Sequence, residues 1–127
     1  MQLNTHLNID KALCGKVTTL QDDYAEVLFH TTGQMSVDTQ GLVHGGFIFG
    51  AVDYAAMTAV NDPLVVLGSA ISRFTAPVKV GDAVLCKAKV ISAKGKKKEV
   101  EVEAFVDEKL VFEGSFTTFV LDKHVLT

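Results

Sequence analysis

The feature that most constrains the fold of this chain is a long, Ala-rich apolar run, Gly45–Val60. It does not alternate between apolar and polar residues, and it is longer than the roughly 3 to 10 residues of a usual strand. We therefore predict a helix, and because its apolar residues go all the way round, we expect it to be buried on every side. Asn61 and Asp62 precede Pro63, which disfavours helical backbone in the residue before it, so the helix should end there.

The rest of the chain has the pattern of strands. Apolar and β-branched residues predict strands over residues 15–20, 24–32, 64–76, 83–92, 99–106 and 110–121. The first two are expected to form a hairpin around Gln21-Asp22-Asp23, and the last four to follow one another in a meander. Between Glu99 and Val106, glutamates alternate with apolar residues, which indicates a sheet with one wet face and one packed face.

This order of elements predicts an α+β fold in which an antiparallel sheet wraps around a single buried helix. Neither the sheet nor the helix can leave its apolar surface in water, so each needs the other. A length of 127 residues fits one domain, residues 1–127. The polar, weakly patterned residues 1–12 are expected to form a short helix or a loose arm.

Composition and charge exclude several classes of function. A net charge of −3 argues against nucleic-acid binding, which usually needs a basic face. No signal peptide is visible, and the apolar run is interrupted by Asp53 and shorter than the roughly 20 residues of a membrane span. Cys14 and Cys86 lie in no CxxC pair, so no metal site is expected, and both are predicted to be reduced, buried thiols. We expect a cytoplasmic protein that binds neither nucleic acid nor membrane.

Asp53 is the physical anomaly of the sequence. It is the only acidic or basic side chain between residues 44 and 62, inside the most apolar segment of the chain. Burial of an unpaired carboxylate is expensive, so Asp53 should have a partner, be neutralised or face a cleft. The alternative is a structural carboxylate at the helix edge, bonded to a nearby hydroxyl.

His44, Gly45 and Gly46 stand at the start of the same predicted helix. Backbone N–H groups at a helix N-terminus are unsatisfied and carry partial positive charge, and glycines let a ligand approach closely. Such a position can polarise a carbonyl oxygen. Alternatively, the glycines only allow close packing. His44 could be an acid or base, but we favour a structural ring that fixes the loop by hydrogen bonding.

Two motifs carry a resemblance to a known family. The segment from Gly41 through His44-Gly45-Gly46, with Asp53 nine residues after the histidine, resembles the hotdog-fold thioesterases of the phenylacetate-pathway (PaaI-like) type. The stretch from Phe74 through Pro77 to Gly81-Asp82 resembles a strand end and turn of the same family. The resemblance covers nearly the whole chain. It implies a hotdog fold and a hydrolase that cleaves a coenzyme A thioester without a cofactor.

The resemblance also implies how the site is assembled. In the family, two subunits pair so that their sheets join and their helices lie side by side, and we expect a homodimer and a dimer of dimers, a homotetramer. Gly45 would hold the thioester oxygen through its N–H, while Asp53 of the other subunit would act as general base or as nucleophile through an anhydride. Gly46 and Phe47 would bind substrate beside them. The pocket is expected to include Phe47, Phe49, Tyr54 and Met57.

Some positions depart from the family pattern. Asp38 stands six residues before His44, where the family often has Asn. A carboxylate can only accept hydrogen bonds, and if Asp38 lies near Asp53 the two would titrate together. Some relatives place Ser or Thr about ten residues before the proline, where Leu67 stands here. Ser69 could serve with a small shift, or it is a plain strand residue.

Basic side chains are candidates for the coenzyme A phosphates. Arg73 and Lys79 flank the Pro77 turn, and four lysines cluster between Lys94 and Lys98. A lysine-rich turn is also a common solvated tip, so both interpretations of that cluster stay open.

Two other functions fit parts of the sequence. Parts of it resemble the acyl-CoA effector domains of malonyl-CoA-sensing repressors of lipid synthesis, so a non-catalytic acyl-CoA sensor is the main alternative. Those regulators carry a DNA-binding helix-turn-helix before the hotdog domain, whereas about a dozen residues precede the first predicted strand here. Hydratase or dehydratase chemistry on acyl-CoA is a third possibility, but that motif differs from His-Gly-Gly.

Overall fold

The long helix predicted from the apolar run is the element around which the chain folds. The computed structural model describes residues 1–127, and its helix α2 (Gly45–Val60) has the predicted bounds. Asn61 ends the helix in the left-handed conformation, with φ 55° and ψ 40°, and its N–H donates to the Met57 carbonyl oxygen. The predicted stop before Pro63 is confirmed.

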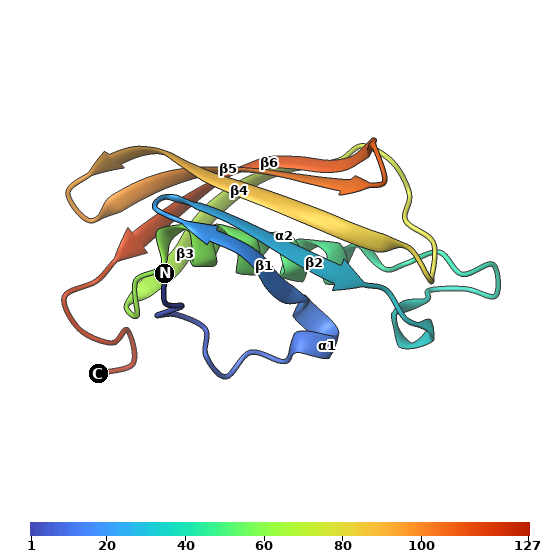
Figure 1. The fold of residues 1–127 in the computed structure, drawn as a ribbon, viewed down its shortest axis with the longest axis horizontal. Coiled ribbons are helices and arrows are strands. Elements are labelled where there is room, and N and C mark those ends of the chain that lie inside the picture. Colours follow the sequence, from blue (N-terminus) through green and yellow to red (C-terminus); the bar gives the residue numbers. More distant parts are fainter.

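Six strands form one antiparallel sheet that wraps around α2 (Figure 1). The strands are β1 (Lys16–Gln21), β2 (Tyr24–His30), β3 (Val65–Phe74), β4 (Ala83–Lys94), β5 (Lys97–Val106) and β6 (Lys109–Val120). A short helix α1 (Lys11–Cys14) and a 3₁₀ turn η1 (Gly33–Met35) complete the structure. The predicted α+β architecture is confirmed.

The position of β3 differs from the prediction. The strand order is β1-β2-β4-β5-β6-β3, so β4, β5 and β6 form a meander, but β3 pairs with β6 at the far edge. The predicted four-stranded meander is therefore wrong. The connection from β3 to β4 is too long for a tight hairpin and contains Pro77, which cannot donate to a ladder. The alternation of apolar and polar residues along a strand predicts which of its faces is buried, but it does not predict which strands lie beside it.

The predicted turns are confirmed at the hairpin tips. Asp23, Gly95 and Asp107 have positive φ values of 61°, 61° and 53°, which close tight turns between paired strands. The turn between β4 and β5 is shorter than predicted, because Lys94 and Lys97 already pair across it.

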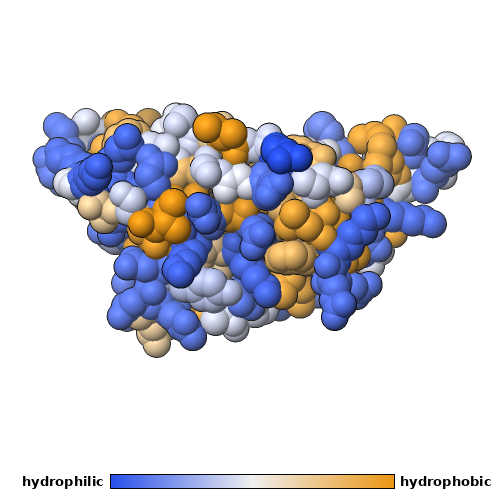
Figure 2. All heavy atoms as spheres, turned by 90° about the horizontal axis from the view of Figure 1, so that it is seen from above, coloured by the Kyte–Doolittle hydropathy of each residue, from blue (hydrophilic) through white to orange (hydrophobic).

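The core lies between the inner face of the sheet and α2. On β5, Val100, Val102 and Ala104 are buried against the helix, while Glu101 and Glu103 are exposed on the outer face. That outer face carries hydrophilic residues interspersed with separate hydrophobic groups (Figure 2). The predicted alternation of a wet and a packed face is confirmed.

Burial changes along α2. From Ala51 to Val60 every residue except Asp53 is buried, but Gly46 is exposed and Phe47 is half-buried. The prediction of burial on every side therefore holds for the second half of the helix and is wrong for its first turns. The helix start projects beyond the core to the open end of the sheet, where the loop before α2 and the connection from β3 to β4 also lie (Figure 1).

The N-terminal residues form an arm followed by α1, and the arm is fixed to the end of α2. The Asn61 side chain accepts from the Asn4 N–H at 2.7 Å and donates to the Gln2 carbonyl oxygen at 2.9 Å. Cys14 at the end of α1 is half-buried and Cys86 is fully buried, so the prediction of two buried thiols is right only for Cys86. None of the helices combines the length and the hydropathy that a membrane span requires.

Replacing Gly114 by alanine is expected to lower the free energy of unfolding by about 1–3 kcal/mol, since overpacking forces backbone shifts. The added Cβ would lie 2.7 Å from the Ile71 carbonyl oxygen on the neighbouring strand. Urea denaturation checks this, with Gly33→Ala as control because nothing lies within 4 Å of a Cβ there. Equal midpoints for both variants would contradict the tight β3–β6 contact.

Candidate functional site

The start of α2 is held in place by backbone contacts from two segments. The Val43 N–H donates to the Val78 carbonyl oxygen at 2.9 Å, and the His44 N–H donates to that of Met35 at 2.8 Å. Isolated bridges join Ser36 to Val43 and Leu42 to Lys79. The loop before the helix is therefore sandwiched between η1 and the β3–β4 connection, which fixes the direction of the first helical turn.

The first two N–H groups of α2 are free. No hydrogen bond within the chain uses the N–H of Gly45 or of Gly46, whereas the Phe47 N–H donates to the His44 carbonyl oxygen at 3.1 Å. His44 precedes the helix in an extended conformation and its side chain caps none of these groups. Two donors with the partial positive charge of a helix N-terminus thus remain to polarise an oxygen atom.

From the sequence we expected the His44 ring to fix the loop by hydrogen bonding, and this prediction is wrong. Its ring is exposed and makes no hydrogen bond. The ring packs edge-on against Phe47, with 6.0 Å between centroids, and a Cβ on Gly46 would lie 3.0 Å from its Nε2. Gly46 is thus the residue that lets the His44 ring lie over the first turn.

Asp53 has no partner in the chain. Its Oδ1 is buried without a hydrogen bond, and burial raises the pKa of the carboxyl to about 6. The alternative of a carboxylate bonded to a nearby hydroxyl is therefore wrong. Beside it, α1 packs on α2, and the pKa of the Cys14 thiol is raised by burial and by the charges of Asp10 and Asp53. An unpaired carboxyl that titrates near neutrality is suited to acid–base or nucleophilic work.

Gly45 and Asp53 are too far apart to act on one carbonyl group within a single chain. They are eight residues apart on one helix, which at 1.5 Å per residue separates them by about 12 Å along its axis. A nucleophile and an oxyanion donor must lie about 3 Å from the same reacting group.

An apolar groove of about 340 Å³ opens beside Gly45. We call it the helix-start groove; besides Gly45 and Thr75 it is lined by Leu42, Val43, Ile48, Phe74, Ala76, Pro77, Val78 and Val111. The Phe74 ring lies 3.7 Å from the position of a Cβ on Gly45, so the groove begins beside the first residue of α2.

Sequence reasoning missed this groove. Of the predicted pocket residues, Tyr54 and Met57 are buried in the core, and Phe49 stacks on Phe116 with 5.4 Å between centroids. Phe47 lies at the helix start, half-buried, but does not line the groove. The signal that could have found it is the apolar residues within the two motifs, at positions 42–43 and 74–78.

Asp38 shapes the loop before the helix. Its Oδ1 accepts from the N–H groups of Gln40 and Leu42 at 3.0 and 3.2 Å, and the Ser36 hydroxyl donates to its carbonyl oxygen at 2.6 Å. Burial is the cause of the raised Asp53 pKa, and Asp38 contributes nothing to it within the chain. The condition set for a joint titration, that Asp38 lies near Asp53, is therefore not met within one subunit.

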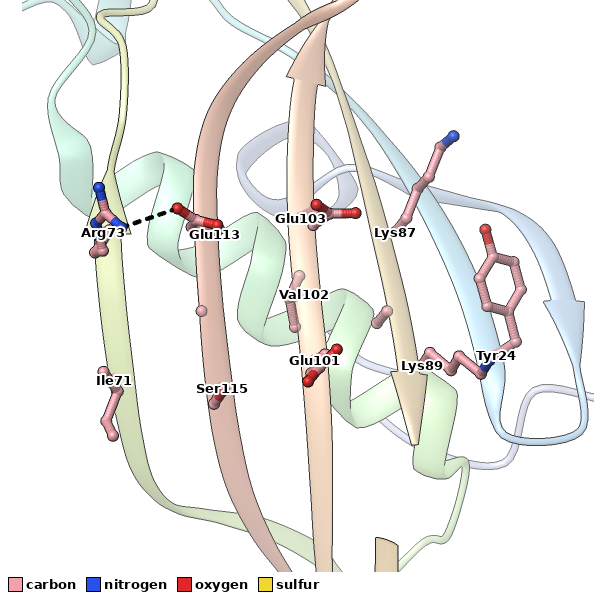
Figure 3. A pocket seen from close by; sticks show the side chains of 12 residues that line it. Tyr24, Ile71, Arg73, Lys87, Lys89, Glu101, Val102, Glu103, Glu113 and Ser115 are labelled. Carbon is pink, nitrogen blue, oxygen red and sulfur yellow. Dashed lines mark ion pairs between the residues drawn. The ribbon is translucent and has the colours of Figure 1, made fainter. Parts of the chain in front are cut away.

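The other predicted substrate contacts are dispersed. Ser69 is exposed on edge strand β3, just after a register shift at Gly68. Arg73 forms an ion pair with Glu113 at 3.3 Å on the outer face of the sheet, away from α2 (Figure 3). Lys79 is exposed and bridges to Leu42, so it is the basic residue that the structure brings to the helix start.

A larger hollow of about 580 Å³ lies on the outer face of the sheet (Figure 3). Its charged side chains face one another across strands, with Lys87 opposite Glu103 and Lys89 opposite Glu101. It is on the other side of the sheet from α2, so it adds nothing to Gly45 or Asp53. No three His, Cys, Asp or Glu side chains lie together in an arrangement that could hold a metal ion.

Two curated proteins resemble this chain over only part of their length. Methylthioribose-1-phosphate isomerase of Aquifex aeolicus is 54% identical over 123 residues, which are 96% of this chain and 27% of that protein. Transcription factor FapR of Caldanaerobacter subterraneus is 33% identical over 99 residues, which are 78% of this chain and 50% of that protein. This chain therefore corresponds to one part of each of them.

Solved structures match the whole fold. A crystal structure of an uncharacterized protein from Pyrococcus horikoshii is 53% identical, covers 100% of this chain and 98% of its own, and has a TM-score of 0.99. An asparagine-to-aspartate mutant of the phenylacetic acid degradation protein PaaI from Thermus thermophilus is 27% identical, with coverages of 87% and 96% and a TM-score of 0.79. The family model of the fluoroacetyl-CoA-specific thioesterase, FlK, matches residues 55–124.

Substitution of Asp38 separates its structural role from an electrostatic one. Asp38→Asn keeps the accepting oxygen, so the loop and the pH dependence of activity should not change. Asp38→Ala removes the acceptor for Gln40 and Leu42 and should cost about 1 kcal/mol of stability. Chemical denaturation and a pH–rate profile check this; a shifted acid limb in Asp38→Asn would instead mean that Asp38 faces Asp53 across an interface between subunits.

Proposed function

Because the chain belongs to the hotdog-fold thioesterase family, we propose that it is an acyl-CoA thioesterase, which hydrolyses a thioester of coenzyme A. The observation that carries the proposal is the unpaired carboxyl of Asp53 on the helix whose first free N–H belongs to Gly45. The family model matches from residue 55 onward, so the roles of these two residues rest on the geometry and the sequence motif.

The site is formed between two subunits in this proposal. Residues 68–74 of β3 are exposed on both faces, with Ile71 at 77% and Phe74 at 51% exposure, and this strand leaves one edge of the sheet unpaired. Such an edge is a template for another strand. Pairing of β3 with its copy joins the two sheets and brings the two α2 helices alongside each other, so Gly45 of one subunit can meet Asp53 of the other.

Each group then has one task in the hydrolysis. The Gly45 N–H donates to the thioester oxygen and stabilises the negative charge that develops on it. Ionised Asp53 either takes a proton from the attacking water or attacks the carbonyl carbon itself, giving an anhydride that water cleaves. The carbon–sulfur bond breaks, the sulfur leaves as the coenzyme A thiol, and the acid forms from the acyl group and water. No cofactor is needed.

A non-catalytic acyl-CoA sensor is the second candidate. The similarity to transcription factor FapR, at 33% identity over 78% of this chain, favours it. In a sensor, acyl-CoA would bind at the same helix start without turnover. A panel of acyl-CoAs offered to the wild type separates the two functions: free thiol released over time supports the thioesterase, and tight binding without release supports the sensor.

Asp53→Asn is expected to lower kcat about 10²- to 10⁴-fold, because the amide can neither take a proton nor attack. In the wild type, activity should fall on the acid side with a midpoint near pH 6, where Asp53 becomes protonated. Release of free thiol from acyl-CoA measures both. Asp62→Asn is the control, since that side chain only accepts from the Leu64 N–H. Full activity in Asp53→Asn would remove Asp53 from the site.

Gly45→Pro removes the proposed donor and leaves the helix intact. Proline is favoured at the first helical position, and His44 already has the extended conformation that a following proline requires, with φ −62° and ψ 129°. We expect kcat to fall about 10²- to 10³-fold, as for loss of one oxyanion donor. Gly45→Ala keeps the N–H and has room for its Cβ, so it should stay active.

Mixed dimers test whether the site takes residues from both subunits. Gly45→Pro and Asp53→Asn chains should each keep at most about 1% of the activity alone, but a dimer containing one of each would keep one intact site. Co-expression should therefore restore about a quarter of the wild-type rate if the chains pair at random. Absence of any recovery, with mixed dimers shown to form, would contradict a shared site.

A further inference from the structure

The helix-start groove has no task in the hydrolysis described above. We propose that it binds the acyl group of the substrate, and that this group is compact, uncharged and apolar. The inference rests on the proposed function, since it takes the thioester oxygen to lie on the Gly45 N–H. Three features of the groove carry it: its position, its lining and its size.

The groove is continuous with the oxyanion donor. Gly45 lines it, and the Phe74 ring lies 3.7 Å from the position of a Cβ on Gly45. A carbonyl group whose oxygen lies on the Gly45 N–H therefore has its substituents at the mouth of the groove. Ile48 and Val111, at 4% and 2% exposure, lie deeper in the lining, so an acyl chain that enters is removed from water.

The lining offers apolar contact and little else. Seven of the ten lining residues are hydrophobic and none is charged. The hydroxyl of Thr75 already donates to the Leu110 carbonyl oxygen at 2.8 Å. Two backbone N–H groups of the lining are engaged as well, since that of Val43 donates to the Val78 carbonyl oxygen and that of Thr75 to the Val111 carbonyl oxygen, whereas those of Ala76 and Val78 have no partner within the chain. A carboxylate in the groove would lose its water without meeting a cation.

Lys79, the nearest cation along the chain, does not line the groove. It follows Val78 but is itself exposed, and its Cγ lies 3.9 Å from the position of a Cβ on Gly41, in the loop before the helix. From its position beside Gly41, the Lys79 ammonium can bind the phosphates of coenzyme A in solvent, while the lining of the groove stays uncharged.

The size of the groove sets the size of the acyl group. At about 340 Å³ it is near the lower end of the roughly 300–1,000 Å³ of small-molecule sites. Leu42, which lies outside β3 and is 42% exposed, forms an apolar rim that an acyl group of this size would cover. Short branched or aryl acyl groups fit these limits, whereas malonyl and succinyl groups carry a carboxylate into an apolar lining.

Two pairs of substrates of equal shape test the inference in the wild-type protein. Isovaleryl-CoA matches malonyl-CoA, and 4-methylpentanoyl-CoA matches succinyl-CoA, with an isopropyl group in place of the carboxylate. We expect kcat/KM to be at least about tenfold higher for the neutral member of each pair, because a buried carboxylate without a partner is costly. Equal or better hydrolysis of the carboxylated members would overturn the inference.

A charge placed on the rim gives a second test of the inference, and a charge placed away from the groove is its matched control. Leu42→Lys puts an ammonium beside the groove and should narrow the difference within each pair at least about threefold, through the attraction of opposite charges. Ile91→Lys changes an isoleucine of similar exposure, 50%, that does not line the groove, and should leave the ratio unchanged. The same narrowing in both variants, or in neither, would mean that the acyl group lies elsewhere.

Binding measurements separate failure of this inference from failure of the proposed function. If no acyl-CoA is hydrolysed, the thioesterase proposal fails, and calorimetric titration of the wild type with the same pairs still tests the groove. Tighter binding of the neutral members supports an apolar acyl site in a sensor. Equal affinity, or tighter binding of malonyl-CoA, overturns the groove as an acyl site whatever the catalytic result.

Discussion

The packing of α2 against the inner face of the sheet is the contact on which the rest of the structure depends. Small side chains at Ala51, Ala55 and Ala59 are fully buried and let the sheet approach the helix closely. The sheet supplies Val100, Val102 and Ala104 from β5 to the same core. This contact uses the second half of the helix and leaves the first turns at the open end of the sheet, which is where the free N–H groups lie.

The same packing sets the energetic cost of Asp53. Burial raises its pKa from 3.8 to about 6, so the folded state holds the proton more tightly than the unfolded chain does. Well below pH 4 the carboxyl is protonated in both states and no stability is lost. Between pH 4 and 6 stability falls, because the carboxyl ionises in the unfolded chain while the buried one keeps its proton; above pH 6 both are ionised and the cost stays constant. At pH 7 the cost is about 3 kcal/mol, a large share of the stability of a small domain. A residue that breaks the local rule at this cost is expected at a functional site rather than a structural one.

The groove and the loop before α2 show how distant segments combine. Residues 36–44 and 74–82 are far apart in sequence, but backbone hydrogen bonds between Val43 and Val78 and the bridge between Leu42 and Lys79 join them. Asp38 holds the first of these segments in shape through its own N–H partners. That junction brings together the apolar lining of the groove, the free N–H groups of the helix start and Lys79. This arrangement favours an acyl-CoA whose acyl group lies in the groove and whose phosphates stay in solvent.

The sequence by itself determined the helix bounds, the hairpin tips, the two faces of β5 and the anomaly of Asp53. These features follow from local rules: side-chain periodicity, the effect of Pro63 on the backbone before it, and the cost of burying a charge. Only the tertiary structure decided that β3 lies beside β6, that Tyr54 and Met57 belong to the core, and that Asp38 bonds to its own loop. Those outcomes depend on which segments pack against each other. Such contacts form between residues that are far apart in the sequence, so a local pattern around either residue cannot predict them.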